Sequence, residues 1–184
     1  MTGKENDRAA RPPILKTERL TLRGHTSADY KHTQALWGDL RVTRYISGRA
    51  STPAESWARL LNYAGHWALL GFGYWLVEES ESGRFVGEVG LADFKRDIKP
   101  SFAGAPEAGW VLAPSAHGKG YATEAVRAVL TWGEEALGMQ RAVCILDPQN
   151  HASAKVAEKC GFTYFTETDF MGSQAVLMER LTKT

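Results

Sequence analysis

The chain has 184 residues, of which 43% are hydrophobic and 23% charged, with a formal net charge of +1. This length predicts one domain with a sizeable core, and the near balance of charge excludes the broad basic surface of a typical nucleic-acid-binding protein. No run of about 18 apolar residues occurs, so we expect no transmembrane helix, and polar residues 1–13 lack the apolar centre of a signal peptide. We expect a flexible segment over residues 1–13 and a single domain over residues 14–184.

The two cysteines, Cys144 and Cys160, match neither a disulfide framework nor a metal-ligand spacing. Each has apolar neighbours, which predicts a buried thiol and fits a reducing cytoplasm. The histidines also lack the spacing of a metal site. We therefore expect a cytoplasmic protein that has no bound metal, no membrane contact and no direct nucleic-acid partner. The sequence leaves open whether the chain forms a homodimer.

The first half of the chain predicts one strand, two helices and a hairpin. Residues 18–24 alternate apolar and polar side chains, as a half-buried strand does, and residues 26–39 follow as a helix capped by Thr26 or Ser27. A second helix over residues 52–70 has Thr52 as its cap, Pro53 at its first position and Glu55 completing a capping box. Residues 73–79 and 84–94 flank a polar turn and predict a β-hairpin.

The second half predicts a parallel crossover followed by another hairpin. A strand over residues 107–113 leads into a long helix that ends near Gly138, and residues 141–147 form the next strand. Asn150 caps a short helix that stops at Gly161, and residues 163–170 and 174–181 pair as the closing hairpin. The order indicates an α/β protein with one mixed sheet.

The sequence "HGKGYAT", residues 117–123, lies between that strand and the long helix. A helix N-terminus exposes unpaired N–H groups and the positive end of the helix dipole, and glycines let the backbone approach a ligand closely. Together these features favour a phosphate site. The glycine pair alone also fits an ordinary turn, and its spacing matches neither the Walker motif nor the dinucleotide fingerprint.

Three motifs in order carry a more specific resemblance: "EAGWVLAP" from residue 107, "GKGYATEA" from residue 118 and "NHASAKVAEKCGF" from residue 150. In these the chain resembles the GNAT superfamily of acetyl-CoA-dependent N-acetyltransferases over about residues 14–181. The nearest resemblance is to the Rim-type branch, which acetylates protein N-termini and includes relatives that act on small amines. The resemblance implies a mostly antiparallel mixed sheet of about seven strands, about four flanking helices and splayed central strands.

The resemblance also implies how acetyl-CoA, as cosubstrate, binds. The strand edge at Val111 and Leu112 is expected to pair with the pantetheine arm, to which Asn150 donates a hydrogen bond. His117 stands where the superfamily has Gln or Arg, and Lys155 is expected to contact a coenzyme phosphate or to remain solvated. Backbone amides over one turn are expected to hold the pyrophosphate: Gly118, Lys119, Gly120, Tyr121, Ala122 and Thr123.

Acetyl transfer to an amine needs a base for the amine proton, a polarised carbonyl and a stabilised thiolate. Glu107 and Glu88 lie on central strands among apolar residues, where a carboxylate is costly unless it is paired or used, so both are candidate bases. Amide groups at a bulge near Val111 are expected to polarise the carbonyl. The tyrosine with which much of the superfamily protonates the thiolate is Ala157 here, and Ser153 is the candidate donor instead; a capping role is its alternative.

The sequence says least about the identity of the acceptor amine. Aromatic residues crowd the first half of the chain, and we take Trp37 and Tyr45 as candidate acceptor contacts, although most such aromatics belong to cores. We expect direct transfer of the acetyl group in a ternary complex. A protein N-terminal amine is the favoured acceptor, a small amine such as a polyamine, amino acid or antibiotic is the alternative, and a binding module without turnover is the non-enzymatic alternative.

Overall fold

A computed structural model describes residues 11–170 and 172–182. Most of the expected flexible segment, residues 1–10, lies outside the described residues. The end of that segment is attached to the domain, because the Pro13 carbonyl accepts a 2.8 Å hydrogen bond from Nε1 of the buried Trp75.

The chain forms a mixed α/β domain with eight strands and five α-helices in the described residues. The strands are β1 (Leu15–Lys16), β2 (Leu20–Arg23), β3 (Tyr74–Glu79), β4 (Phe85–Ala92), β5 (Glu107–Leu112), β6 (Arg141–Leu146), β7 (Thr163–Phe170) and β8 (Ser173–Leu181). The helices are α1 (Tyr30–Trp37), α2 (Leu40–Thr43), α3 (Pro53–Leu70), α4 (Tyr121–Leu137) and α5 (His151–Lys159). The expected GNAT-type fold is confirmed, and the short β1 and α2 account for the elements beyond those expected.

Local signals set the helix ends where the sequence predicted them. Thr52 Oγ1 accepts a hydrogen bond from the Glu55 amide while the Glu55 carboxylate accepts from the Thr52 amide, so α3 begins with a capping box and Pro53 at its first position. Asn150 caps α5 by accepting from the Ser153 amide at 3.1 Å. The predicted helix over residues 26–39 is shorter, since residues 27–29 form a 3₁₀ turn before α1 begins at Tyr30.

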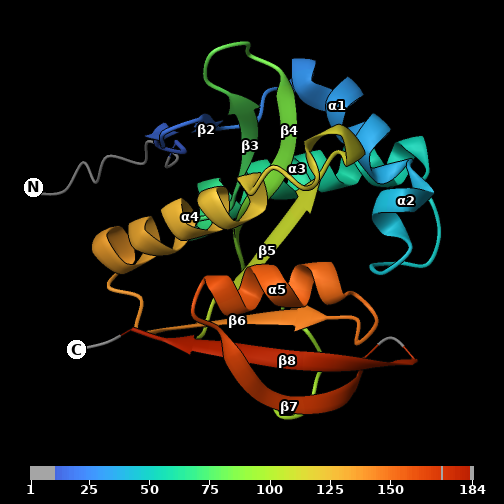
Figure 1. The fold of residues 1–184 in the computed structure, drawn as a ribbon, viewed down its shortest axis with the longest axis vertical. Helices are drawn as coiled ribbons and strands as arrows, with labels where there is room; N and C mark the ends of the chain where they lie inside the picture. Colours follow the sequence, from blue (N-terminus) through green and yellow to red (C-terminus); the bar gives the residue numbers. More distant parts are fainter. Residues whose placement is uncertain (1–10, 171, 183–184) are drawn as a thin grey trace, which may run out of the picture.

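The strands form one sheet in the order β1-β2-β3-β4-β5-β6-β8-β7, antiparallel except between β5 and β6. Helix α4 crosses the near face in Figure 1, where it packs against β2, β4 and β5, while α3 passes behind the sheet and packs against β3. The buried side of α4 carries Ala125, Val126, Val129 and Leu130, which join the main core. None of the described helices is long and apolar enough to span a bilayer.

The centre of the sheet is split. β4 and β5 stay in register from Gly87 opposite Leu112 to Ala92 opposite Glu107, whereas β5 and β6 share a single register pair, Glu107 with Val143. Beyond that pair the two strands diverge, as Figure 1 shows. The expected splay of the central strands is therefore confirmed, and it leaves unpaired backbone facing the opening.

Candidate active site

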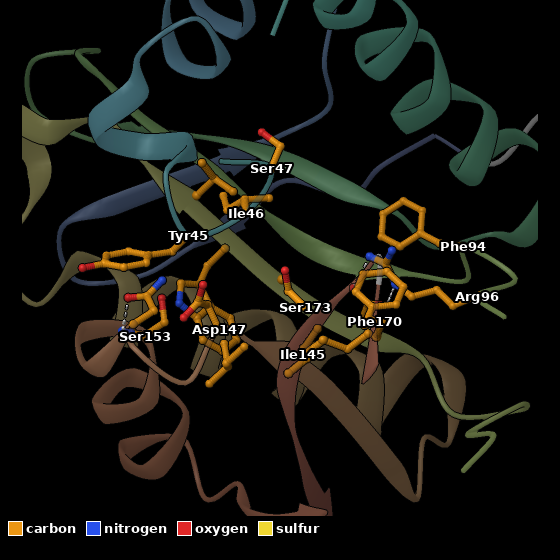
Figure 2. A pocket seen from close by; sticks show the side chains of 18 of the residues that line it. Tyr45, Ile46, Ser47, Phe94, Arg96, Ile145, Asp147, Ser153, Phe170 and Ser173 are labelled. Atoms are coloured by element: carbon orange, nitrogen blue, oxygen red, sulfur yellow. Dashed lines mark hydrogen bonds and ion pairs between the residues drawn. The ribbon is translucent and has the colours of Figure 1, made fainter. Parts of the chain in front are cut away.

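A cavity of about 390 Å³ occupies the split between β5 and β6 and extends toward α3. Figure 2 shows Tyr45, Asp147 and Ser153 at one end and Phe94, Arg96 and Phe170 at the other. Its wall draws on most of the fold, from the end of α1 to the β7–β8 hairpin. The lining residues used below are Trp37, Arg44, Tyr45, Arg59, Tyr63, Tyr74, Arg96, Glu107, Val111, Asp147, Asn150 and Ser153.

The glycine turn next to this split has the geometry of an anion site. Gly118 and Gly120 have φ angles of 75° and 81°, a left-handed backbone that favours glycine. Gly120 is the N-cap of α4, and no side chain among the described residues caps this helix end. A Cβ built at Gly118 would meet no atom within 4 Å, so the space beside the turn is open. The exposed amides at this helix end therefore suit a phosphate group.

Arg19 lies against the same turn and was not predicted from the sequence. Its Nη1 donates to the Lys119 carbonyl at 2.9 Å, its guanidinium pairs with Glu124, and it lies 4.8 Å over the Tyr121 ring. Lys119 Nζ is 3.8 Å from Glu79. Two cations thus flank the glycine turn. One of them comes from a part of the chain 100 residues away, so no local spacing could have revealed it.

Strand alternation decides which backbone groups of β5 face the opening. The Ala113 amide bonds to Val86 on β4, so the N–H of Val111 also points to β4, whereas the backbone of Leu112 faces the split. His117 holds the end of the strand, with Nε2 2.9 Å from the Leu112 carbonyl oxygen. The expected bulge at residues 111–112 was wrong, because the β4–β5 register continues through Leu112.

The start of α5 places two predicted residues at the cavity. Asn150 uses its side-chain oxygen to cap the helix through the Ser153 amide, which leaves its amide nitrogen for a ligand. Ser153 lines the cavity, and its hydroxyl makes no hydrogen bond within the described chain. Lys155 is exposed on the same helix and lies outside the cavity lining.

Glu107 lies at the closed end of the split and is held by Arg96. Arg96 donates from Nε to Oε2 at 2.5 Å and from Nη2 to Oε1 at 2.7 Å, a two-point pair in which Glu107 is buried. Burial alone would lower the pKa of Arg96, but the hydrogen bonds and charge of Glu107 raise it overall. The predicted base therefore lines the cavity as an ion-paired carboxylate.

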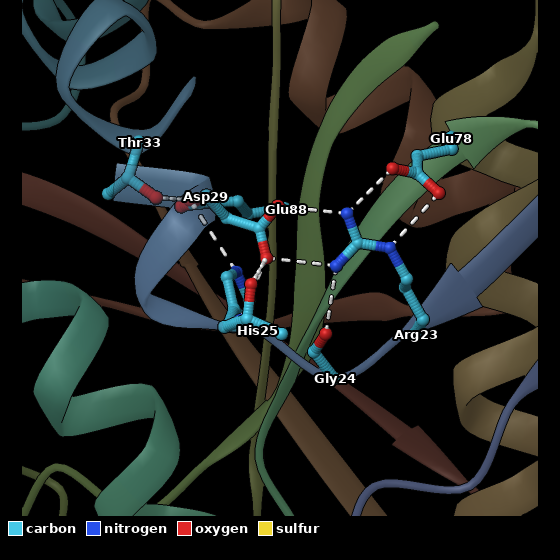
Figure 3. Close-up of polar contacts among 8 residues, drawn as sticks. Arg23, Gly24, His25, Asp29, Thr33, Glu78 and Glu88 are labelled. Atoms are coloured by element: carbon cyan, nitrogen blue, oxygen red, sulfur yellow. Dashed lines mark hydrogen bonds and ion pairs between the residues drawn. The ribbon is translucent and has the colours of Figure 1, made fainter. Parts of the chain in front are cut away.

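Glu88, the other predicted base, is fully buried and lies behind the cavity wall. Its carboxylate accepts from Thr33 Oγ1 at 2.6 Å, and His25 Nε2 lies 3.6 Å away (Figure 3). The same carboxylate accepts from Trp37 Nε1 at 2.8 Å. Burial would raise the pKa of Glu88, but the contacts with His25, Thr33 and Trp37 lower it below its usual value. These contacts fix the indole of Trp37, whose ring lines the cavity.

The predicted acceptor contacts, Trp37 and Tyr45, both line the cavity. Each carries an arginine that the sequence analysis missed: Arg59 lies 3.5 Å over the Trp37 ring and Arg44 lies 4.7 Å over the Tyr45 ring. Asp147, at the end of β6, was also missed. Its position as the first polar residue after a buried strand of the parallel pair was the available signal.

Both cysteines are buried thiols, as predicted. Burial raises the pKa of Cys160 to about 11 and raises the pKa of Cys144 further. Neither cysteine is among the residues that line the cavity. Within the described residues, His, Cys, Asp and Glu form no group of three or more that could hold a metal ion.

Comparisons with known proteins agree with this architecture. YkkB of Bacillus subtilis is 30% identical over 155 residues, which cover 82% of this chain and 85% of YkkB. A GNAT-family acetyltransferase from Bordetella pertussis superimposes with a TM-score of 0.81 and 31% identity over 92% of this chain and 99% of that one.

Two more distant structures share the fold alone. RimL, a ribosomal L7/L12 alpha-N-protein acetyltransferase in complex with coenzyme A, has a TM-score of 0.75 at 16% identity, with 92% of this chain and 98% of that one covered. Spermidine N-acetyltransferase from Vibrio cholerae, in complex with CoA and spermine, has a TM-score of 0.72 at 18% identity, with 90% and 96% covered. The acetyltransferase (GNAT) domain family matches residues 19–163, and the chain accordingly belongs to the GNAT acetyltransferases, a family of acyltransferases.

Proposed function

We propose that this protein transfers an acetyl group from acetyl-CoA to a primary amine by direct attack within a ternary complex. The observation that carries the proposal is the composition of the cavity. One cavity is lined by Glu107, by the aromatic acceptor candidates Trp37 and Tyr45, and by Ser153, whose hydroxyl makes no hydrogen bond within the described residues. These are the groups that acyl transfer from a thioester to an amine needs in one place.

The chain's own residues fit acetyl-CoA. The uncapped α4 N-terminus and the open space beside Gly118 suit the pyrophosphate, with Arg19 and Lys119 as nearby cations. The backbone N–H of Leu112 and the amide nitrogen of Asn150 face the split, where an extended pantetheine arm can hydrogen-bond as a strand does. Acetyl-CoA supplies the activated acyl group.

The proposed step forms a C–N bond between the amine and the thioester carbonyl carbon and breaks the C–S bond. The amine proton goes to Glu107 through water, because this carboxylate lies at the closed end of the split, whereas Ser153 lies at the open end. The Ser153 hydroxyl donates to the departing thiolate. Glu88 lies outside the cavity lining, so we assign it the positioning of Trp37, with catalysis by Glu88 as the competing prediction.

Direct transfer is preferred to a covalent acetyl-cysteine. A nucleophilic cysteine needs a lowered pKa and access to the acyl group. Burial raises the pKa of both cysteines, and neither lines the cavity. Mass spectrometry of protein quenched during turnover is expected to find no acetyl group on Cys144 or Cys160.

The acceptor amine belongs to one of two classes. The Rim-type motifs favour a protein N-terminal amine, and the fold is also that of an enzyme named for spermidine, so the motifs and the fold leave both classes open. A cavity of about 390 Å³ that must also receive the end of the pantetheine arm favours a small amine.

The test is thiol release from acetyl-CoA in the presence of two acceptor panels, one of peptides that differ in their first residue and one of small amines that includes polyamines and amino acids. Release that depends on an acceptor, with the acetylated product confirmed by mass spectrometry, supports the transferase and identifies the acceptor class. Tight acetyl-CoA binding with no release on either panel would favour a binding module instead.

A further inference from the structure

The cavity contains arginines that differ from most others in the chain. Most described arginines pair with a carboxylate: Arg19, Arg23, Arg41, Arg49, Arg84, Arg96, Arg141 and Arg180. Within residues 11–170 and 172–182, Arg44 and Arg59 line the cavity and form no ion pair with a carboxylate. The wall of the cavity thus holds two cations whose charge no neighbouring acid neutralises.

Arg59 is the better placed of the two. It projects from α3 and stacks on the Trp37 ring at 3.5 Å, and Nε1 of that indole donates a hydrogen bond to the buried Glu88. Its Nε atom is buried and makes no hydrogen bond within the described chain. A buried donor without an acceptor costs free energy unless a ligand supplies one. Arg59 therefore presents a buried donor that no acceptor among the described residues satisfies.

The cavity wall also carries two acidic side chains. Arg96 is neutralised by Glu107, and Asp147 lies at the Ser153 end in Figure 2. An acceptor that carries both an ammonium group and a carboxylate matches a wall with acids and an unpaired arginine. A polycation without an acidic group would place charge against Arg59 and Arg44 instead.

We propose that the acceptor is an amino-acid-type amine, whose carboxylate binds the guanidinium of Arg59 over Trp37 while its amine reaches the thioester. This inference rests on the proposed acetyl transfer and narrows its acceptor. Arg44 stacks on Tyr45, is exposed and adds a second positive charge to the cavity wall. Arginine suits the role because its planar fork binds a carboxylate through two hydrogen bonds.

The test compares free amino acids with their C-terminal amides, which keep the side chain and the amine but lose the anion. The amide also mimics a peptide N-terminus, and spermidine serves as a polycation. Losing the neighbouring carboxylate lowers the pKa of an amine, so the amide presents more free base at neutral pH. Preference for the acid would therefore reflect binding rather than reactivity. We expect kcat/KM for the best free acid to exceed that of its amide by about tenfold to a hundredfold.

The Arg59→Gln variant should remove this preference. It should lower kcat/KM for the free amino acid and leave kcat/KM for the amide nearly unchanged. Arg59→Lys keeps the charge and should retain part of the preference. Arg127, an exposed α4 residue that donates to the Lys159 carbonyl, provides the matched control Arg127→Gln. An unchanged KM for acetyl-CoA and an unchanged melting temperature would show that the variants are folded.

The outcomes separate the two proposals. Acid-specific turnover that collapses in Arg59→Gln supports the inference. Efficient acetylation of the amides or of spermidine, or an acid preference that Arg59→Gln leaves intact, overturns it while the acetyl transfer stands. Absence of turnover with acids, amides, peptides and polyamines alike overturns the proposed function, and with it the inference.

Discussion

Replacement of Glu88 by glutamine tests how the wall of the cavity is built. The carboxylate accepts hydrogen bonds from Thr33 and Trp37 without contact with solvent. A glutamine can preserve both bonds in neutral form. Its oxygen can face the indole, which only donates, and its amide nitrogen can face the hydroxyl of Thr33, which also accepts.

The cost follows from the change in bond strength. Hydrogen bonds to a charged group contribute about 1.5–3 kcal/mol each, and neutral ones about 0.5–1.5 kcal/mol, so two weakened bonds cost about 2 kcal/mol. The pKa of Glu88 shows that the substitution should destabilise the protein. This pKa lies below its usual value, because the contacts of the carboxylate with its partners outweigh burial and favour the ionised form. For a chain of this size, a loss of about 2 kcal/mol in the free energy of unfolding lowers the melting temperature by about 4–8 °C.

The effect should depend on pH. Because the folded-state pKa of Glu88 is lowered from 4.5, its ionised form stabilises the protein fully above that value. This contribution is lost as the pH falls through the folded-state pKa. The difference in melting temperature between the wild type and Glu88→Gln should therefore be constant near neutrality and shrink below about pH 4.5.

Calorimetric melting curves over this pH range, together with pH–rate profiles, measure both expectations. As a comparison, Glu88→Ala leaves the Trp37 indole without an acceptor and opens a cavity, so it should cost about 4 kcal/mol. If Glu88 positions Trp37, Glu88→Gln keeps the shape of the pH–rate profile and raises the acceptor KM. Loss of turnover by about a thousandfold, with the rise of rate with pH on the acidic limb of the profile abolished, would refute this reasoning and make Glu88 the base.

Three further predictions concern the cavity and the glycine turn. Glu107→Gln should lower kcat at least about tenfold and flatten the rise of rate with pH, because it removes the proton acceptor; an unaltered pH–rate profile would exclude it as the base. Ser153→Ala should lower kcat and leave the acetyl-CoA KM unchanged, since the Asn150 cap uses the Ser153 backbone amide; a raised KM at unchanged kcat would make Ser153 a binding residue. Gly118→Ala should destabilise the fold by about 1–2 kcal/mol through its positive φ angle and raise the acetyl-CoA KM. Gly138→Ala is the control for backbone strain alone: its melting temperature should fall by a similar amount while its acetyl-CoA KM stays unchanged.

Features encoded within one turn of the chain were predictable from the sequence. The caps at Thr52 and Asn150 and the glycine turn before α4 depend on residues three or four apart, so their patterns could be seen directly. The motifs that resemble the GNAT superfamily likewise predicted Glu107 and Ser153 as site residues, and both line the cavity.

Features that depend on packing were not predictable. Arg19 reaches a turn 100 residues away, and Arg59 becomes distinctive only because its neighbours leave it without a carboxylate. Glu88 illustrates the opposite case. Its place on a central strand correctly indicated a buried carboxylate, yet only the packing of α1 shows that this carboxylate lies outside the cavity lining and holds Trp37 from behind it.

The split between β5 and β6 links ligand affinity to the integrity of the domain. Beyond Glu107 and Val143 the two strands share no register pair, so two edges with free hydrogen-bonding groups face each other inside the molecule. In the acetyl-CoA complex that we propose, a pantetheine arm bonded to these edges would act as a missing strand and tie the β1–β5 half of the sheet to the β6–β8 half. The melting temperature should then rise with the fraction of protein that has acetyl-CoA bound. A substitution that destabilises either half of the sheet should also lower the affinity for acetyl-CoA.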